Sequence, residues 1–357
     1  MKFIIIFFSA LLAATSASSQ TLNPFVVNHG ATDSPLYRPA IQVLGGELYY
    51  LDTFRANQGI QVYDWSSGEL KRIIPLNRAG VGIRSFKVLS PDSIMVFSDY
   101  YKKSFSLING QGKPLGLFNM IGDHEVHPSL ANWLSYRGSA IAVMNKKLLL
   151  AKKVLRVEAL ESSAGIVSVD LEAKKSWVMP PLTEAQIPTL SDSVMKYLAP
   201  NITSLPEDRV LVSYPFLDEV QVYTGDPQGA SKVDLSGNDL LPQLKNAPVS
   251  QPKGESVLSK IYLNILYNES RKEIYRLVRV PIDKAAYREF KASKKKSPIP
   301  HYAVLRFNLD FEATGVTLMA IDTYHAEFGL VIVGEDLWCL RSLSSSGGNL
   351  VFEKLQF

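Results

Sequence analysis

The sequence predicts an all-β fold built by repetition of one unit. Two hairpins provide the signal, IQVYDWSSGELKRIIPL (60–76) and FSLINGQGKPLGLF (105–118). Each hairpin holds two runs of alternating apolar and polar residues joined by a Gly-bearing turn. Asp64 corresponds to Asn109 and Leu70 to Leu115, a shift of 45 residues in both cases. Helical patterns are few, so the chain reads as small sheets that follow one another.

The first two units define the pattern. A strand, GELYYLD (46–52) or DSIMVFSD (92–99), precedes the hairpin in each of them. An Asp or Asn at the start of the hairpin turn can accept hydrogen bonds from its own backbone, and Gly supplies the positive φ that such turns need. The recurrence therefore follows from turn chemistry, without any appeal to function.

Later units are looser copies of the first two. They are found, in order, in KKLLLA (146–151) with GIVSVDLEAKKSWVMP, in RVLVSY (209–214) with EVQVYTGDPQGASKVDL, and in SKIYLNILYNESRKEIYRLVRVPI. After the polar insert around Lys291, YAVLRFNLDFEATGVTLMAI repeats the pattern once more, and FGLVIVGEDLWCLRSLSSSGGNLVFEKLQF supplies three final strands. This makes about six units, of which the last is one strand short. We expect a strand from the N-terminal region, around Leu36 to Leu44, to complete it.

A lone hairpin is marginally stable in water, and each unit has too few apolar residues to bury both faces of its sheet. Stacking the sheets around a common axis buries these faces, so the sequence predicts a single six-bladed β-propeller with short helical insertions between blades. We place the helices at Pro128–Tyr136, Ser191–Leu198 and Asp283–Lys296, and a long loop at Leu241–Ser256. Two β-sandwiches are the alternative.

The N-terminus is predicted to be a secretory signal peptide, residues 1–19, followed by the propeller domain, residues 20–357. Lys2 precedes an apolar run from Phe3 to Ala14, and small residues lie before Gln20. The run is too short to span a bilayer, and no other segment is long enough, so we expect no transmembrane segment after cleavage. No Cys for lipid attachment lies near the site. The expected location is secreted, periplasmic or at the cell surface.

Composition limits the classes of partner. Apolar residues make up 46% and charged residues 20%, and the formal net charge is +4, which does not indicate a nucleic acid or an anionic membrane as partner. The basic run Lys291–Lys296 is interpreted as a solvated loop or helix end. The lone Cys339 cannot form an internal disulfide, and its apolar neighbours predict a buried strand.

Several segments resemble a family of secreted bacterial proteins of unknown function. The resemblance is carried by GELYYLD, VYDWSSGELKRIIPL, PDSIMVFSD, IYLNILYNESRKEIYR, VLRFNLDFEATG and YHAEFGLVIV, and it covers nearly the whole mature chain. It implies a six-bladed propeller in the periplasm or at the cell surface. Many members carry a lipid-modified Cys, which this chain lacks. The family brings no activity or site residues.

No short catalytic motif is present, and no catalytic residue, metal ligand or cofactor is assigned; the ligand-binding residues are unknown. The sharpest metal candidate is GDHEVHP, with His124, Glu125 and His127, but its two His residues are three apart rather than four, and a polar loop is the preferred interpretation. The remaining residues His29, His301 and His325 are scattered. Tyr49, Tyr50, Tyr262 and Tyr275 occupy strand positions and are expected in the core rather than on a sugar-binding surface.

These observations favour a monomeric propeller that binds an unknown protein or small-molecule ligand without catalysis. The alternative is a metal-assisted hydrolase or lyase at the propeller axis, with His301 or His325 beside acidic residues. The identity of the ligand is beyond what the sequence indicates.

Overall fold

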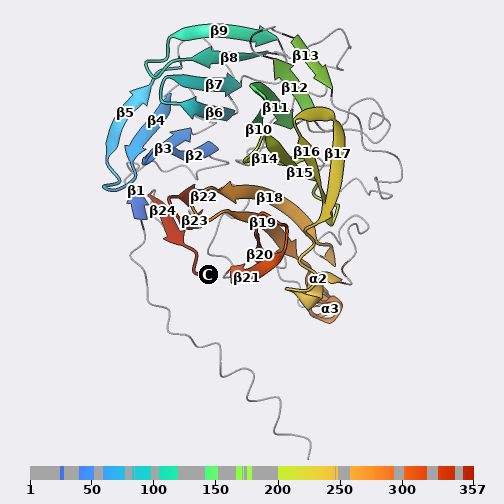
Figure 1. Cartoon of the computed structure of the whole chain (residues 1–357). Coiled ribbons are helices and arrows are strands. Elements are labelled where there is room, and N and C mark those ends of the chain that lie inside the picture. The colour runs from blue at the N-terminus through green and yellow to red at the C-terminus, as the bar shows by residue number, and fades with distance from the viewer. Residues whose placement is uncertain are drawn as a thin grey trace, which may run out of the picture.

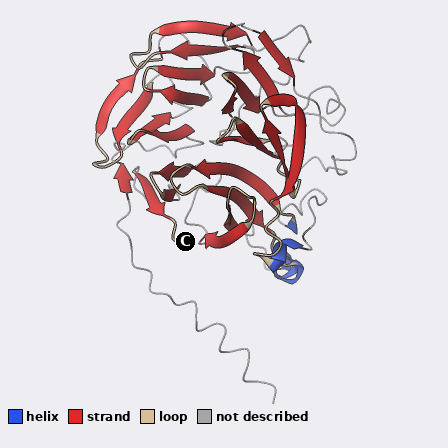
Figure 2. Ribbon diagram, viewed as in Figure 1, coloured by secondary structure: helices blue, strands red, loops and turns tan. Residues whose placement is uncertain are grey.

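A computed structural model shows the architecture of the chain. It describes residues 25–27, 40–51, 59–76, 83, 85–97, 104–119, 141–151, 166–170, 172, 175–178, 200–245, 247, 258–292, 301–319, 329–341 and 349–357. The described strands form six four-stranded antiparallel sheets arranged around a common axis (Figures 1 and 2). The six-bladed β-propeller predicted from the sequence is confirmed.

Each sheet is one blade, and the strands of a blade follow one another from the axis outward. Blades 1 to 3 comprise β2 (Ala40–Leu44), β3 (Glu47–Leu51), β4 (Ile60–Asp64) and β5 (Leu70–Ile74); β6 (Ser85–Ser90), β7 (Ser93–Phe97), β8 (Ser104–Ile108) and β9 (Pro114–Asn119); and β10 (Ile141–Met144), β11 (Lys147–Ala151), β12 (Ile166–Asp170) and β13 (Lys175–Val178).

Blades 4 to 6 have the same order, with the N-terminal strand added to the last of them. They comprise β14 (Asn201–Leu205), β15 (Arg209–Ser213), β16 (Glu219–Thr224) and β17 (Asp226–Asp234); β18 (Ile261–Asn268), β19 (Glu273–Val280), β20 (His301–Phe307) and β21 (Ala313–Met319); and β22 (Leu330–Val333), β23 (Asp336–Leu340), β24 (Leu350–Lys354) and β1 (Phe25–Val27).

The hydrophobic core lies between the blades. Buried side chains form clusters that each combine residues from neighbouring sheets, such as Tyr49 of β3 with Val96 of β7 between blades 1 and 2. A larger cluster joins blades 2, 3 and 4, and further clusters join blade 4 to 5, 5 to 6 and 6 to 1. Each sheet therefore buries its faces against its neighbours, as the stacking argument requires.

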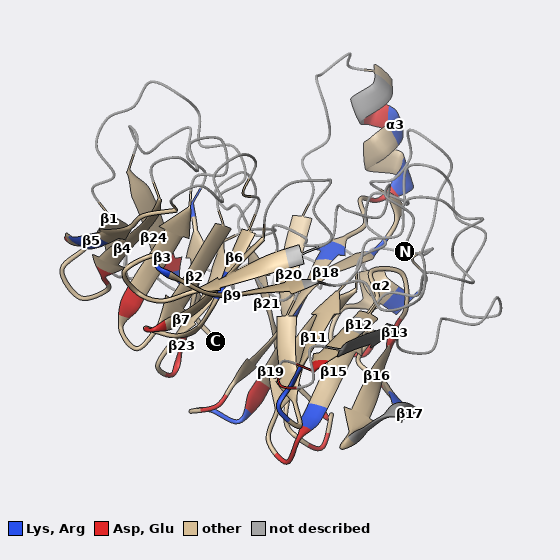
Figure 3. Cartoon of the chain, turned by 90° about the horizontal axis from the view of Figure 1, so that it is seen from above, with Lys and Arg blue, Asp and Glu red and all other residues tan. Residues whose placement is uncertain are grey.

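The antiparallel strand order gives the propeller two different ends. The first and second strands of each blade are joined by tight turns at one end, called here the turn end, and so are the third and fourth strands of blades 1, 2, 4 and 5. The second and third strands, and successive blades, are connected at the opposite loop end, where α3 (Lys284–Ala292) lies. Figure 3 shows α3 at one end of the ring and turns with acidic residues at the other.

Ring closure uses a different strand from the one that the sequence suggested. β1 completes blade 6 by pairing with β24, with Val26 opposite Val351. The expected segment 36–44 instead contains β2, the innermost strand of blade 1. Gly45 and Gly46, with φ of 57° and 75°, form the two-residue turn that joins β2 to β3 in an antiparallel hairpin. Because this turn pairs β2 with its own blade, the closing strand must come from earlier in the chain.

Aromatic side chains fill the junction between blades 6 and 1. The ring of Phe25 stacks on Trp65 at a centroid distance of 4.2 Å, and Trp65 meets the rings of Trp338 and Phe352 edge-on at 5.6 and 5.4 Å. Trp65 lies in the β4–β5 turn of blade 1, whereas the other three rings belong to blade 6. Side-chain packing therefore reinforces the backbone pairing that closes the ring.

The helices form small additions at the loop end. α3 confirms part of the predicted helix 283–296, and Asp283 caps it by accepting hydrogen bonds from the backbone N–H groups of Ala285 and Ala286. α2 (Pro242–Lys245) interrupts the segment expected to be a loop. The helices predicted at 128–136 and 191–198 lie outside the described residues. None of the helices in the described part of the chain is long and apolar enough to cross a membrane.

Candidate functional site

The innermost strands form a ring around the axis. Strands β2, β6, β10, β14, β18 and β22 lie nearest to the centre (Figure 1) and read AIQVL, SFKVLS, IAVM, NITSL, IYLNILYN and LVIV. These sequences contain no Asp, Glu, His, Cys or Arg, and one Lys. Several aliphatic side chains on them are part-exposed, and Val143 is 45% exposed. The described wall of the axis is therefore mainly aliphatic, with one ionisable amine.

Side chains fasten neighbouring inner strands to one another. The Gln42 carboxamide donates to the carbonyl of Val88 at 2.8 Å and accepts from its N–H at 2.9 Å, linking blade 1 to blade 2. The Ser204 hydroxyl accepts from the N–H of Val143 at 2.9 Å and donates to its carbonyl at 3.0 Å, linking blade 4 to blade 3. An inner strand has no further strand on its axial side, so these contacts satisfy backbone groups that would otherwise lack partners. They also hold the wall rigid.

Lys87 is the basic residue of this wall. It lies on β6 between Phe86 and Val88, which are buried in the cluster between blades 1 and 2. Because side chains alternate along a strand, Lys87 points to the other face, towards blade 3. Its cross-strand partner Met95 belongs to the cluster on that side. Among the described residues Lys87 has no ion pair or hydrogen-bonded partner, and removal of solvent by the surrounding protein lowers its pKa.

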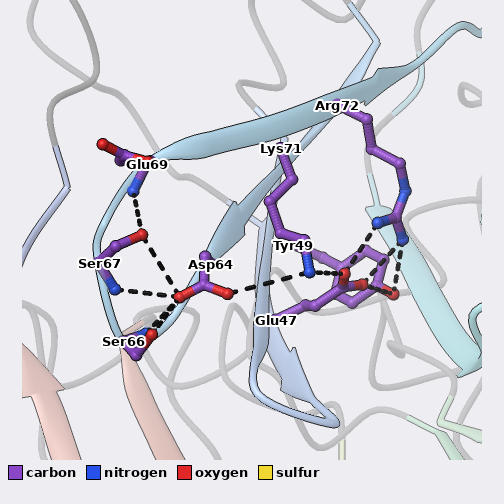
Figure 4. Close-up of polar contacts among 8 residues, drawn as sticks. All are labelled: Glu47, Tyr49, Asp64, Ser66, Ser67, Glu69, Lys71 and Arg72. Carbon is purple, nitrogen blue, oxygen red and sulfur yellow. Dashed lines mark hydrogen bonds and ion pairs between the residues drawn. The ribbon is translucent and has the colours of Figure 1, made fainter.

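The turn end of blade 1 carries a dense network of charged groups (Figure 4). The Arg72 guanidinium donates to both Glu47 carboxylate oxygens, Nη1 to Oε1 and Nη2 to Oε2, each at 2.8 Å. Lys71 Nζ lies 2.8 Å from Glu47 Oε1, and the Tyr49 hydroxyl donates to Oε2 at 2.8 Å. Asp64 Oδ1 accepts from the backbone N–H of Ser66 and closes the adjoining turn. Two strands and one turn are thus held by a single carboxylate and its partners.

These contacts fix the protonation states of the network. The hydrogen bond from Arg72 lowers the pKa of Glu47 to about 2, so that Glu47 is a carboxylate at neutral pH. Burial, followed by the hydrogen bond to Glu47, raises the pKa of Tyr49 to about 12. Hydrogen bonds from Ser66 and Ser67 lower the pKa of Asp64. Glu47 is therefore poorly suited to act as a general base, because its oxygens are committed to cations.

Blades 5 and 6 repeat this arrangement in simpler form. In blade 5, Tyr275 donates to Glu273 at 2.9 Å, and Arg306 lies 3.7 Å from the same carboxylate. In blade 6, Asp336 pairs with Lys354 at 2.7 Å. In all three blades the acid begins the second strand, two residues before an aromatic side chain, and this spacing is visible in the sequence as ELY, EIY and DLW. The basic partner cannot be recognised in this way, because it comes from another strand of the blade.

A second polar network is buried between blades 4 and 5. The fully buried Arg276 of β19 donates to the carbonyl oxygens of Asp218, Leu235 and Leu217 at 2.6 to 2.7 Å, and lies 3.4 Å from the centroid of the Tyr262 ring. Burial lowers the pKa of Arg276 to about 10. Asp218 also accepts from the Tyr262 hydroxyl at 2.7 Å and pairs with Lys260 at 2.6 Å. The described groups bond one another, so the network serves to fasten two blades.

Few of the residues considered from the sequence can be placed. His301 begins β20 at the loop end and is exposed. The positions His29, His124, Glu125, His127 and His325 lie outside the described residues. Within the described part of the chain, no group of three or more His, Cys, Asp or Glu side chains is placed to hold a metal ion.

The expectations for the buried residues can be checked. Tyr49, Tyr50, Tyr262 and Tyr275 are at most 1% exposed and pack in the core, as predicted. Cys339 is fully buried on β23, and burial raises the pKa of its thiol. Sequence reasoning missed Lys87 and Arg276. For Lys87 the signal is its place in the short apolar run SFKVLS, where a charge is out of character.

Comparison with known proteins places this architecture in a family. A family model described as "Domain of unknown function (DUF4221)" matches residues 37–305. The chain belongs to this family. The matched segment extends from just before β2 into β20, so the DUF4221 region covers most of the propeller. Comparison with curated proteins finds no match.

Solved structures share the DUF4221 chain's fold. A member of the DUF4221 family from Bacteroides vulgatus ATCC 8482 is 16% identical, with a TM-score of 0.67 and coverage of 94% of this chain and 97% of that one. A predicted exported protein from Bacteroides fragilis NCTC 9343 is 12% identical, with a TM-score of 0.51 and coverage of 95% and 96%. A luciferin-regenerating enzyme is 10% identical, with a TM-score of 0.50 and coverage of 94% and 95%. At these identities the similarity shows the fold alone.

Proposed function

We propose that this DUF4221 protein is a secreted, periplasmic or cell-surface binding module that holds its ligand at the propeller axis without chemical conversion. The observation that carries the proposal is the composition of the six inner strands. Their wall is aliphatic and part-exposed, with one amine and no carboxylate or imidazole. Aliphatic surface with a few placed polar groups is typical of ligand-binding sites. Metal-assisted catalysis needs carboxylate, imidazole or thiolate ligands, which these strands do not supply.

The ionised groups elsewhere support the same conclusion. At the turn end, Glu47, Glu273 and Asp336 are engaged by neighbouring cations. Between blades 4 and 5, Asp218 is engaged by Lys260 and Tyr262. Groups committed to one another stabilise the scaffold, and a stable scaffold with a preformed wall favours binding.

The experiment uses purified protein consisting of residues 20–357. The protein is incubated with a mixture of small carboxylates, amines and sugars, and bound molecules are recovered by gel filtration and identified by mass spectrometry. Elemental analysis of the same sample measures bound metal. We expect ligand recovered unchanged and in no more than stoichiometric amount. Consumption of a compound over many turnovers, or a metal bound at one equivalent, would refute binding without catalysis.

The proposed location rests on residues 1–19 and has its own test. Expression of the full chain in a Gram-negative host should give periplasmic or secreted protein whose mass begins at Gln20. A variant without residues 1–19 should stay in the cytoplasm. Full-length protein in the cytoplasmic fraction of the unaltered strain would contradict the proposal. Gel filtration of the exported protein tests the expected monomer and the single domain 20–357.

A further inference from the structure

Lys87 is the charged member of a set of six residues that occupy equivalent positions on the inner strands of the six blades. The register places it opposite Met95, the third residue of β7. The corresponding inner-strand residues, opposite the third residue of the second strand in the other blades, are Gln42, Ala142, Thr203, Leu266 and Val331. All five are uncharged, so Lys87 brings an isolated positive charge to this level.

The surroundings of Lys87 combine access with low hydration. Lys87 is part-exposed as a residue. Removal of solvent by the surrounding protein nevertheless lowers its pKa. Both properties suit a side chain on an innermost strand, beside the axis and against the facing blade. A cation there without a counter-ion is costly, and the cost is recovered when an anion binds.

Lys87 is the charged group available for a ligand, because two of the neighbouring polar side chains are occupied. The Gln42 carboxamide is occupied at both ends by the backbone of Val88, and the Ser204 hydroxyl by that of Val143. The rest of the adjacent wall is mainly aliphatic apart from Thr203, with Val143 45% exposed on the facing blade 3. A ligand that satisfies both parts of this wall has one anionic group and an apolar body.

We infer that Lys87 is the anion-binding residue of an axial site for small amphipathic carboxylates, such as a medium-chain fatty acid anion. The carboxylate pairs with the Lys87 ammonium, and the hydrocarbon body lies along the aliphatic side chains of the inner strands. This inference deepens the proposed function and depends on it, because it names the class of ligand that the axis binds.

The test compares probes of equal length and different charge. Isothermal titration of the protein, residues 20–357, with sodium octanoate and with 1-octanol measures both affinities. We expect Lys87→Met to weaken octanoate binding by about tenfold or more, the loss of one charge-assisted hydrogen bond. Lys87→Arg should bind octanoate within about threefold of wild type, because the charge is kept. Octanol should bind wild type and Lys87→Met equally.

Two further measurements separate a binding role from a structural one. Lys113→Met, a change on the exposed β8–β9 turn, should leave octanoate binding unchanged. Lys87→Met should melt at the same temperature as wild type or higher, since it removes a poorly solvated charge. Equal octanoate binding by wild type and Lys87→Met, or no octanoate binding by wild type, would overturn the assignment. Neither result bears on the proposed function, binding without catalysis, which is refuted only if a ligand is turned over or a metal is bound.

Discussion

Substitution of Arg276 by Met should strongly destabilise the propeller. Methionine keeps much of the side-chain volume but removes the donors to the buried carbonyl groups of Leu217, Asp218 and Leu235. Each buried acceptor left without a donor costs about 1 to 3 kcal/mol, and part of this is offset because no guanidinium need be desolvated. The contact between Arg276 and the Tyr262 ring is lost as well. We expect a net loss of about 3 to 5 kcal/mol in the free energy of unfolding.

The assay is urea unfolding at 25 °C and pH 7, followed by tryptophan fluorescence, with the midpoint and the slope fitted separately. The matched control is Arg271→Met, which removes a charge from the β18–β19 turn, where Arg271 Nη1 lies 3.7 Å from Glu273 Oε2. Surface pairs of this kind contribute about 0 to 1 kcal/mol. If Arg276→Met unfolds within about 1 kcal/mol of wild type, the network is not a fastening between blades and the reasoning is refuted.

Three further predictions concern closure, acid stability and the thiol. Trp65→Ala should lower the free energy of unfolding by about 3 to 5 kcal/mol in the same assay, because it removes the ring that contacts the other three aromatic side chains. The control Leu117→Ala, at a side chain that is 66% exposed, should change the free energy of unfolding by less than about 1 kcal/mol. A small effect at Trp65 would exclude aromatic packing as a closing force. Glu47 has its pKa lowered from 4.5 to about 2 on folding, so its stabilising contribution is present above pH 4.5 and lost as the pH falls towards 2. Glu47→Gln should flatten the stability profile in that window, and a profile parallel to wild type would contradict the shift. Cys339 should resist iodoacetamide in the native protein and react after unfolding in urea, since its thiol is buried and its pKa raised; rapid native labelling would show that blade 6 opens.

The outer three strands of the blades could be read from the sequence because their signals are local. The turn residues confirm the mechanism: Asp64 accepts hydrogen bonds from Ser66 and Ser67, and Asn109 accepts them from Gln111 and Lys113. These turns hold the third and fourth strands in register, so the repeat of 45 residues is a repeat of turn chemistry. The fold class follows from repetition of this local pattern.

The inner strands of blades 2 to 4 were not predicted, and β2 of blade 1 was predicted as a strand but assigned to the last blade. β6, β10 and β14 have four to six residues and are buried at half or more of their positions, so they lack the alternation that marks a half-exposed strand. The same omission placed the closing strand at 36–44 instead of at β1, because the segment appeared to have no blade of its own. The axial wall was therefore not predicted from sequence pattern, and the signal for Lys87, a charge within the run SFKVLS, had no strand to which it could be assigned.

The polar networks depend on contacts between segments distant in sequence. Glu47 and Arg72 are 25 residues apart, and Arg276 meets Leu217 across 59 residues. No periodicity connects such pairs, because their proximity results from the path of the chain within blade 1 for the first pair and from blade 4 to blade 5 for the second. Glu47 is visible at the start of its strand, and its partner Arg72 becomes visible only in the folded ring.

The most direct test of an axial binding site is a crystal structure of the protein soaked with 8-bromooctanoate, with data collected at the bromine absorption edge. The account predicts a single anomalous peak inside the ring of inner strands, and carboxylate density within hydrogen-bonding distance of Lys87 Nζ. A bromine peak only at the outer strands or at the loop end, with the axis occupied by water, would contradict it.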